Sequence, residues 1–187
     1  MTDYLRLALV FLLAVNPALA FLSFLPVRNE AAPNTRVPAA AFGAVLAMGL
    51  YLAAVAGAAS LLDLLEVEPE TFRVAAGVVL AAVGARALLP PLPPYGQAPA
   101  GWRAGIYPLG IPLLAGPAGL MASLSYAADE GAATTFAAIV PALLLAAALL
   151  AWAPARWRPA FAMIAPLAAA LLVAAGAGLI VTGVRDI

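Results

Sequence analysis

The chain has no cysteine, no histidine and no lysine, and only 10% of its residues are charged. Without cysteine there can be no disulfides and no thiol redox chemistry, and without histidine the commonest metal ligand is missing as well. The net charge is zero, so nothing indicates a nucleic-acid partner. We therefore expect neither a metal nor a cofactor, and no nucleic acid among the partners.

Apolar residues dominate instead. They make up 66% of the 187 residues, and the mean hydropathy is +1.05. A soluble domain carries roughly 25% charged residues, whereas a membrane-spanning helix needs about 20 mostly apolar ones. Six stretches meet that condition: residues 4–25, 37–62, 71–89, 105–127, 132–152 and 160–184. The sequence predicts an all-α integral membrane protein with six transmembrane helices, surrounded by the lipid bilayer.

Within the first stretch, Ala18-Leu19-Ala20 follows an apolar run and resembles a signal-peptide cleavage site. A signal peptide, however, begins with a positively charged region. Here Asp3 offsets Arg6, so we expect the first stretch to be a span.

Arginine is distributed unevenly between the connections. Six of the nine arginines flank the connections 26–37, 90–104 and 153–159, and three lie on the other side. Arginine-rich loops stay in the cytoplasm. We therefore expect these three connections inside, both termini outside, and a location in the inner (plasma) membrane.

A proline-rich connection, residues 90–104, divides the chain into two parts with three predicted spans each. We expect 1–89 and 105–187 to be three-helix repeats joined by this cytoplasmic linker. Because three is odd, the second repeat is inverted relative to the first. Inverted repeats are typical of secondary transporters.

Two helix-breaking strings lie one hundred residues apart, each inside an apolar segment. They are Leu13-Ala14-Val15-Asn16-Pro17-Ala18 and Leu113-Leu114-Ala115-Gly116-Pro117-Ala118, with Ser23 and Ser123 at the same offset. Proline removes a helix hydrogen bond, and lipid cannot replace it, so such breaks occur where protein or a wet cavity does so. We predict broken helices 1 and 4 with a solute between them. The candidate substrate-binding residues are Asn16, Pro17, Ser23, Pro112, Gly116, Pro117 and Ser123.

The chemistry of such breaks suits a small neutral solute. Freed amides attract anions and freed carbonyls attract cations, so facing breaks can hold a zwitterionic amino acid without charged side chains. No aspartate or glutamate lies at mid-depth in any predicted span, which leaves no catalytic residues for a membrane enzyme. A coupling cation and a homo-oligomer remain open as partners. Arg73 and Arg86, at the ends of the third span, are expected to reach the membrane surface.

The second break resembles the fourth-segment signature of the MarC family of six-span membrane proteins. The matching string is Tyr107-Pro108-Leu109-Gly110-Ile111-Pro112-Leu113-Leu114-Ala115-Gly116-Pro117-Ala118. Asn16-Pro17 with Phe21 and Pro26 is similar to the family's first-segment pattern, and residues 72–80 (FRVAAGVVL) to its third. The chain departs from the family in two places: Ala18 and Leu19 stand where a glycine is expected near the first break, and Ala118-Gly119 replaces the usual Gly-Ala after Gly116-Pro117.

The resemblance implies a member of the LysE-like exporter group, in which some proteins are described as neutral amino acid transporters. By this resemblance Asn16, Pro17, Pro108, Pro112, Gly116 and Pro117 carry the function. We expect a secondary transporter or exporter that works by alternating access. The alternative is a non-transporting membrane scaffold or assembly protein whose breaks serve packing only.

Overall fold

The computed structural model describes residues 2–30, 35–89 and 101–187, and within them the chain is helical, with no strand. The elements are α1 (Thr2–Val15), α2 (Pro17–Glu30), α3 (Arg36–Leu65), α4 (Pro69–Leu88), η2 (Gly101–Gly105), η3 (Ile106–Leu114), α5 (Pro117–Glu130), α6 (Ala132–Trp152), η4 (Ala155–Trp157) and α7 (Arg158–Asp186). Most of the predicted linker lies outside the described residues, and residues 101–104 belong to η2.

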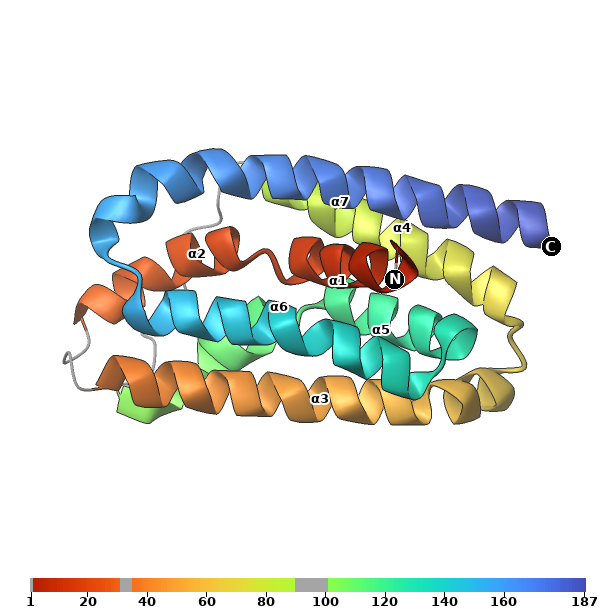
Figure 1. Cartoon of the computed structure of the whole chain (residues 1–187), viewed down its shortest axis with the longest axis horizontal. Coiled ribbons are helices and arrows are strands. Elements are labelled where there is room, and N and C mark those ends of the chain that lie inside the picture. Colours follow the sequence, from red (N-terminus) through yellow and green to blue (C-terminus); the bar gives the residue numbers. More distant parts are fainter. Residues whose placement is uncertain (1, 31–34, 90–100) are drawn as a thin grey trace.

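The long helices lie side by side along one axis (Figure 1). In the described part of the chain, five segments are long and apolar enough to cross a membrane: Tyr4–Asn29, Arg36–Leu65, Pro69–Leu88, Ala132–Trp152 and Ala155–Asp186. The pair Gly101–Leu114 and Pro117–Glu130, bent by 59°, adds a sixth if it is counted as one span. The predicted membrane-protein fold is confirmed.

Local sequence explains where the helices begin and end. α3 ends at Glu66, whose left-handed φ of 53° lets its N–H bond back to the last turn. α4 begins with Pro69, at the position where a missing N–H costs nothing. Gly131, with a φ of 87°, makes the sharp turn between α5 and α6. Pro141 and Pro166, by contrast, lie inside the continuous helices α6 and α7.

α4 and α7 pack against each other through glycine. A Cβ atom on Gly77 would lie 2.6 Å from the carbonyl oxygen of Gly176, and one on Gly176 would lie 2.6 Å from that of Gly77. Seven residues further along each helix, a Cβ on Gly84 would lie 2.8 Å from the Ala169 oxygen, and one on Gly183 would lie 2.9 Å from the Glu70 oxygen. Small residues let membrane helices approach this closely. The two helices are antiparallel, and each presents the same pattern to the other.

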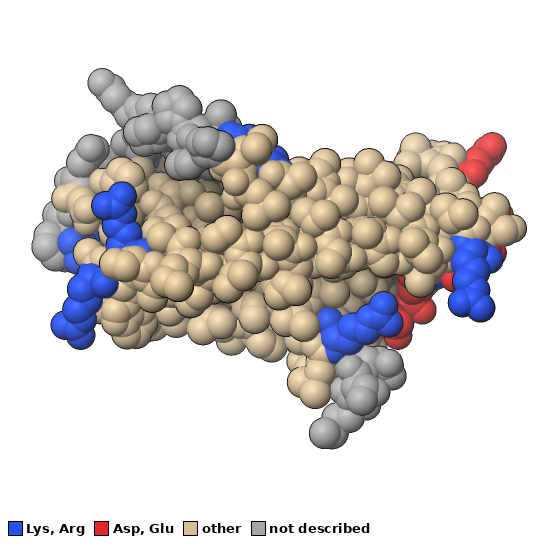
Figure 2. All heavy atoms as spheres, turned by 90° about the horizontal axis from the view of Figure 1, so that it is seen from above, with Lys and Arg blue, Asp and Glu red and all other residues tan. Residues whose placement is uncertain are grey.

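Charged side chains lie mostly near the two ends of the bundle, with an uncharged band between them (Figure 2). One end, the basic end, carries Arg28, Arg36, Arg103, Arg156 and Arg158, in or beside connections between spans. The other, the acidic end, has the α3–α4 and α5–α6 turns and the C-terminus. This separation is the expected pattern for a membrane protein, and it allows the predicted orientation to be tested.

A cysteine in place of the exposed Arg156 is expected to resist an impermeant thiol reagent added outside intact cells, because arginine bias places the basic end inside. Asp63→Cys, at the acidic end, is expected to react. The chain has no cysteine of its own, so labelling reports only the introduced residue. Labelling of Arg156→Cys with protection of Asp63→Cys would reverse the orientation.

Candidate functional site

The first break is confined to one residue, Asn16. Its φ of 43° is left-handed, a conformation that asparagine tolerates better than most residues. The Asn16 N–H still donates to Leu12, 3.0 Å away, and the Ala20 N–H to Asn16, also at 3.0 Å. Pro17 has no N–H, so the Leu13 carbonyl loses its usual helical donor. α1 and α2 are therefore one span with a local interruption.

The Asn16 side chain stabilises this interruption. It is only 5% exposed. Its Oδ1 accepts a hydrogen bond from the Leu19 N–H at 3.1 Å and so caps α2. Its Nδ2 donates to the Ala165 carbonyl of α7, also at 3.1 Å. Asn16 thus uses its amide within the protein and joins the first span to the last.

The second break is longer than the sequence predicted. The prediction centred it on Pro112 and Gly116–Pro117, but the chain is irregular from Tyr107 onward, with extended φ and ψ angles at Tyr107 and at Ile111. Both residues precede proline, which disfavours the helical conformation in the preceding residue. Pro108 therefore extends the break by a full turn toward the basic end.

Tyr51 of α3 lies at this second break. Its side chain is fully buried, and its hydroxyl donates to the Leu114 carbonyl at 3.1 Å. The Tyr51 hydroxyl oxygen also lies against Gly119 in the first turn of α5, where there is no room for a Cβ atom. Tyr51 thus satisfies a carbonyl within the break and packs against the helix after it. Sequence reasoning missed Tyr51, because it is one aromatic residue in a long apolar helix.

The other predicted site residues differ in their surroundings. Pro17 is buried, Ser23 and Gly116 are half-buried, and Pro112 and Pro117 are exposed on the protein surface. Ser123 is buried and donates to the Leu120 carbonyl of its own helix at 2.7 Å, as isolated hydroxyls often do. Ser125 and Thr135 are also buried, and their hydroxyls have no hydrogen-bond partner among the described residues.

The comparison with known families agrees with this architecture. The family described as MarC family integral membrane protein matches residues 1–187, the whole chain. The chain belongs to the MarC family. No curated protein and no solved structure matches it.

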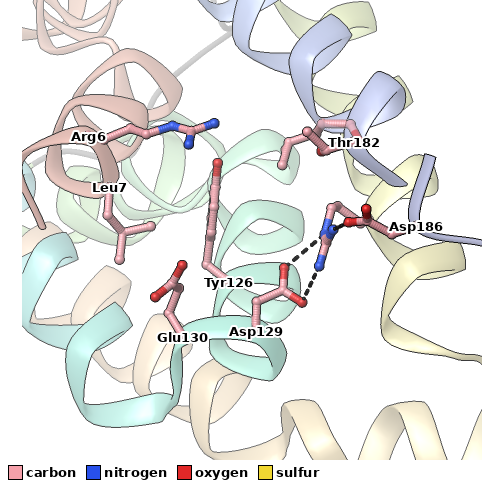
Figure 3. A pocket seen from close by; sticks show the side chains of 9 residues that line it. Arg6, Leu7, Tyr126, Asp129, Glu130, Thr182 and Asp186 are labelled. Carbon is pink, nitrogen blue, oxygen red and sulfur yellow. Dashed lines mark hydrogen bonds and ion pairs between the residues drawn. The ribbon is translucent and has the colours of Figure 1, made fainter. Parts of the chain in front are cut away.

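In this MarC protein a cavity of about 230 Å³ opens at the acidic end (Figure 3). We call it the terminal cavity. Its lining residues are Arg6, Leu7, Arg73, Tyr126, Asp129, Glu130, Leu179, Thr182 and Asp186. None of the predicted site residues is among them, so the cavity lies apart from the two breaks.

Arg73 ties three helices of the MarC protein together beside this cavity. Its Nε and Nη2 donate to the two carboxylate oxygens of Asp129 on α5, at 3.1 and 2.9 Å, and its Nη1 donates to Asp186 on α7 at 2.5 Å. The side chains of Arg73 and Asp129 are each 17% exposed. The sequence placed Arg73 at the membrane surface but did not reveal these partners.

At the basic end, a second arginine joins segments that are distant in the sequence. Arg28 of α2 is buried and donates to the Ala153 carbonyl after α6 at 2.6 Å. Its guanidinium carbon lies 5.6 Å from the centre of the Phe21 ring, which in turn lies 4.7 Å from that of Phe161 on α7. The two ends of the MarC protein are therefore each held by an arginine that links the first three spans to the last three.

Proposed function

We propose that this MarC protein transports or exports a small neutral solute, foremost a neutral amino acid, by alternating access at a site between its two broken spans. The observation that carries the proposal is the placing of two half-helices. α2 and α5 both begin at a break, and from there they run in opposite directions along the bundle (Figure 1). Their amino-terminal ends therefore both point to the middle of the spans.

Helix amino termini attract negative charge. The end of α2 is capped by Asn16, whereas the residue before α5 is Gly116, which has no side chain and makes no cap. We place the solute's carboxylate beside Gly116. There it accepts hydrogen bonds from the first N–H groups of α5, as the Asn16 side-chain oxygen does for α2. The Leu13 carbonyl, deprived of its donor by Pro17, offers a partner for the ammonium group.

The packing of α4 against α7 supports a mechanism in which the two halves of the chain move relative to each other. Gly77 and Gly176 are 99 positions apart, as are Gly84 and Gly183, and each pair makes equivalent contacts. When residue i of one element contacts residue j of the other, and the equivalent of j contacts the equivalent of i, the two elements are related by a two-fold axis. It supports residues 1–89 and 105–187 as inverted repeats that rock against each other.

In the described conformation the first break is buried, whereas Pro112 and Pro117 of the second break are exposed on the surface. Asn16 is buried, Gly116 is half-buried, and both ends of the bundle are held by Arg73 and Arg28. These features are compatible both with a transporter and with a packing-only scaffold. The two functions must therefore be separated by measuring transport.

The proposal is tested by measuring uptake into proteoliposomes for the parent and for variants of Asn16. The assay uses labelled neutral amino acids, with and without ion gradients. Asn16→Leu is expected to abolish uptake and to destabilise the protein, because leucine strains the left-handed backbone and leaves buried groups unpaired. Asn16→Gly tolerates that backbone but loses the hydrogen bonds to Leu19 and Ala165 that position the first break, so it is expected to fold and yet to lose uptake.

Ser60→Ala is the matched control, because Ser60 is exposed on α3 away from both breaks. It is expected to transport like the parent. If Asn16→Gly also keeps the parent rate, or if the parent moves no member of the panel, the scaffold becomes the better interpretation.

A further inference from the structure

The terminal cavity has charged groups of both signs. Two arginines and three carboxylates line it: Arg6, Arg73, Asp129, Glu130 and Asp186. The lining therefore carries one net negative charge. Such a lining disfavours a simple anion and suits a ligand that brings at least one positive group.

The charges in this cavity are not all neutralised by one another. Arg73 is held by Asp129 and Asp186, whereas Arg6 and Glu130 form no ion pair within residues 4–29, 35–89 and 101–187, whose side chains are described. Figure 3 shows Arg6 near the hydroxyl end of Tyr126, and Asp129 and Glu130 on either side of that side chain. One free cation and one free anion thus share a cavity with an aromatic wall.

The size of the cavity limits what it can hold. Its volume of about 230 Å³ is below the range of roughly 300–1,000 Å³ that is usual for drug-sized ligands. Leu7 is buried behind it, and Leu179 is a second buried apolar residue in the lining. The space suits a molecule of a few heavy atoms with a short apolar part.

We propose that the terminal cavity is a second binding site, separate from the breaks, for a small zwitterion. Arg6 binds its carboxylate, Glu130 and Asp129 bind its ammonium group, and the Tyr126 ring packs against its side chain. The Arg73 network holds α4, α5 and α7 in place and so fixes the wall that carries Asp129. The choice of an amino acid as the zwitterion rests on the proposed function, but the location and residues of this site do not.

Equilibrium dialysis of the purified full-length protein against radiolabelled L-alanine tests the site. The measurement uses the Gly116→Leu variant, in which the site at the breaks is blocked, so that the remaining binding reports the terminal cavity. Propionate and isopropylamine, which keep only the carboxylate or only the ammonium group, serve as competitors. We expect unlabelled alanine to compete at least about tenfold better than either, because two charge-assisted contacts are needed together.

Adding Arg6→Gln or Glu130→Gln is expected to weaken alanine binding by about fivefold or more, since each removes one charged partner. Arg185→Gln and Glu66→Gln are the matched controls. Both residues are exposed at the same end but do not line the cavity, and both variants are expected to bind like the parent of the series.

Equal affinity in the Arg6 and Glu130 variants, or no alanine binding in Gly116→Leu, would overturn the terminal site. Uptake by the unaltered protein would still stand as support for the proposed function in either case. Conversely, charge-dependent binding without any uptake would keep the terminal site and remove the transport proposal.

Discussion

Leucine in place of Gly116 is expected to abolish solute uptake while leaving the fold intact. A Cβ at this position would meet a single atom, the Pro112 oxygen, at 3.0 Å, so a shift of a few tenths of an ångström accommodates it. The φ of −88° suits any residue. The leucine side chain would, however, cover the uncapped amides at the start of α5, where we place the solute's carboxylate.

Uptake into proteoliposomes and thermal unfolding in detergent measure the two parts of this prediction separately. Gly178→Leu is the matched control, since Gly178 is exposed on α7 with no atom within 4 Å of an added Cβ. Normal uptake by Gly116→Leu would show that the second break does not contact the solute. Loss of uptake together with loss of folding would instead point to a structural role for Gly116.

Leucine at Gly77 is expected to have the largest effect on stability. Its Cβ would lie 2.6 Å from the Gly176 carbonyl oxygen and 2.9 Å from the Ile180 backbone nitrogen. Backbone atoms of a packed helix cannot move aside as a flexible side chain can, so α4 and α7 must separate. Overpacking typically costs about 1–3 kcal/mol and occasionally more, and we expect a value at or above the top of that range.

Thermal or denaturant-induced unfolding in detergent checks this prediction, with Gly57→Leu as the control. Gly57 lies on α3 with nothing within 4 Å of an added Cβ, and its replacement is expected to be tolerated. Because the contact is reciprocal, Gly176→Leu is expected to cost about as much as Gly77→Leu. Parent-like stability in either glycine variant would contradict the close helix approach.

The spans and breaks could be predicted because they depend on local sequence. Hydropathy over about 20 residues identifies a span, and proline interrupts a helix wherever it stands. Pro108 could have extended the predicted second break by the same reasoning. The functional role of the break residues stays a prediction, because their burial alone does not say whether they contact a solute.

The contacts between helices that are distant in the sequence could not be predicted in this way. Tyr51 and its partner Leu114 are 63 residues apart, and Arg73 and Asp129 are 56 apart. Hydropathy and helix periodicity carry no information on which turn of one helix faces which turn of another. The terminal cavity was missed for the same reason, since its lining comes from α1, α4, α5 and α7.

The glycine contact between α4 and α7 also affects how easily these helices can turn against each other. Ordinary helix pairs interlock, with ridges of side chains seated in the grooves of the neighbour. At Gly77 and Gly176 backbone meets backbone, and the Ile180 side chain lies against Gly77. The closest contact at this point of the crossing is therefore made by backbone atoms, about which the two helices can change their angle. For the proposed alternating access, this crossing offers a pivot between the two parts of the chain.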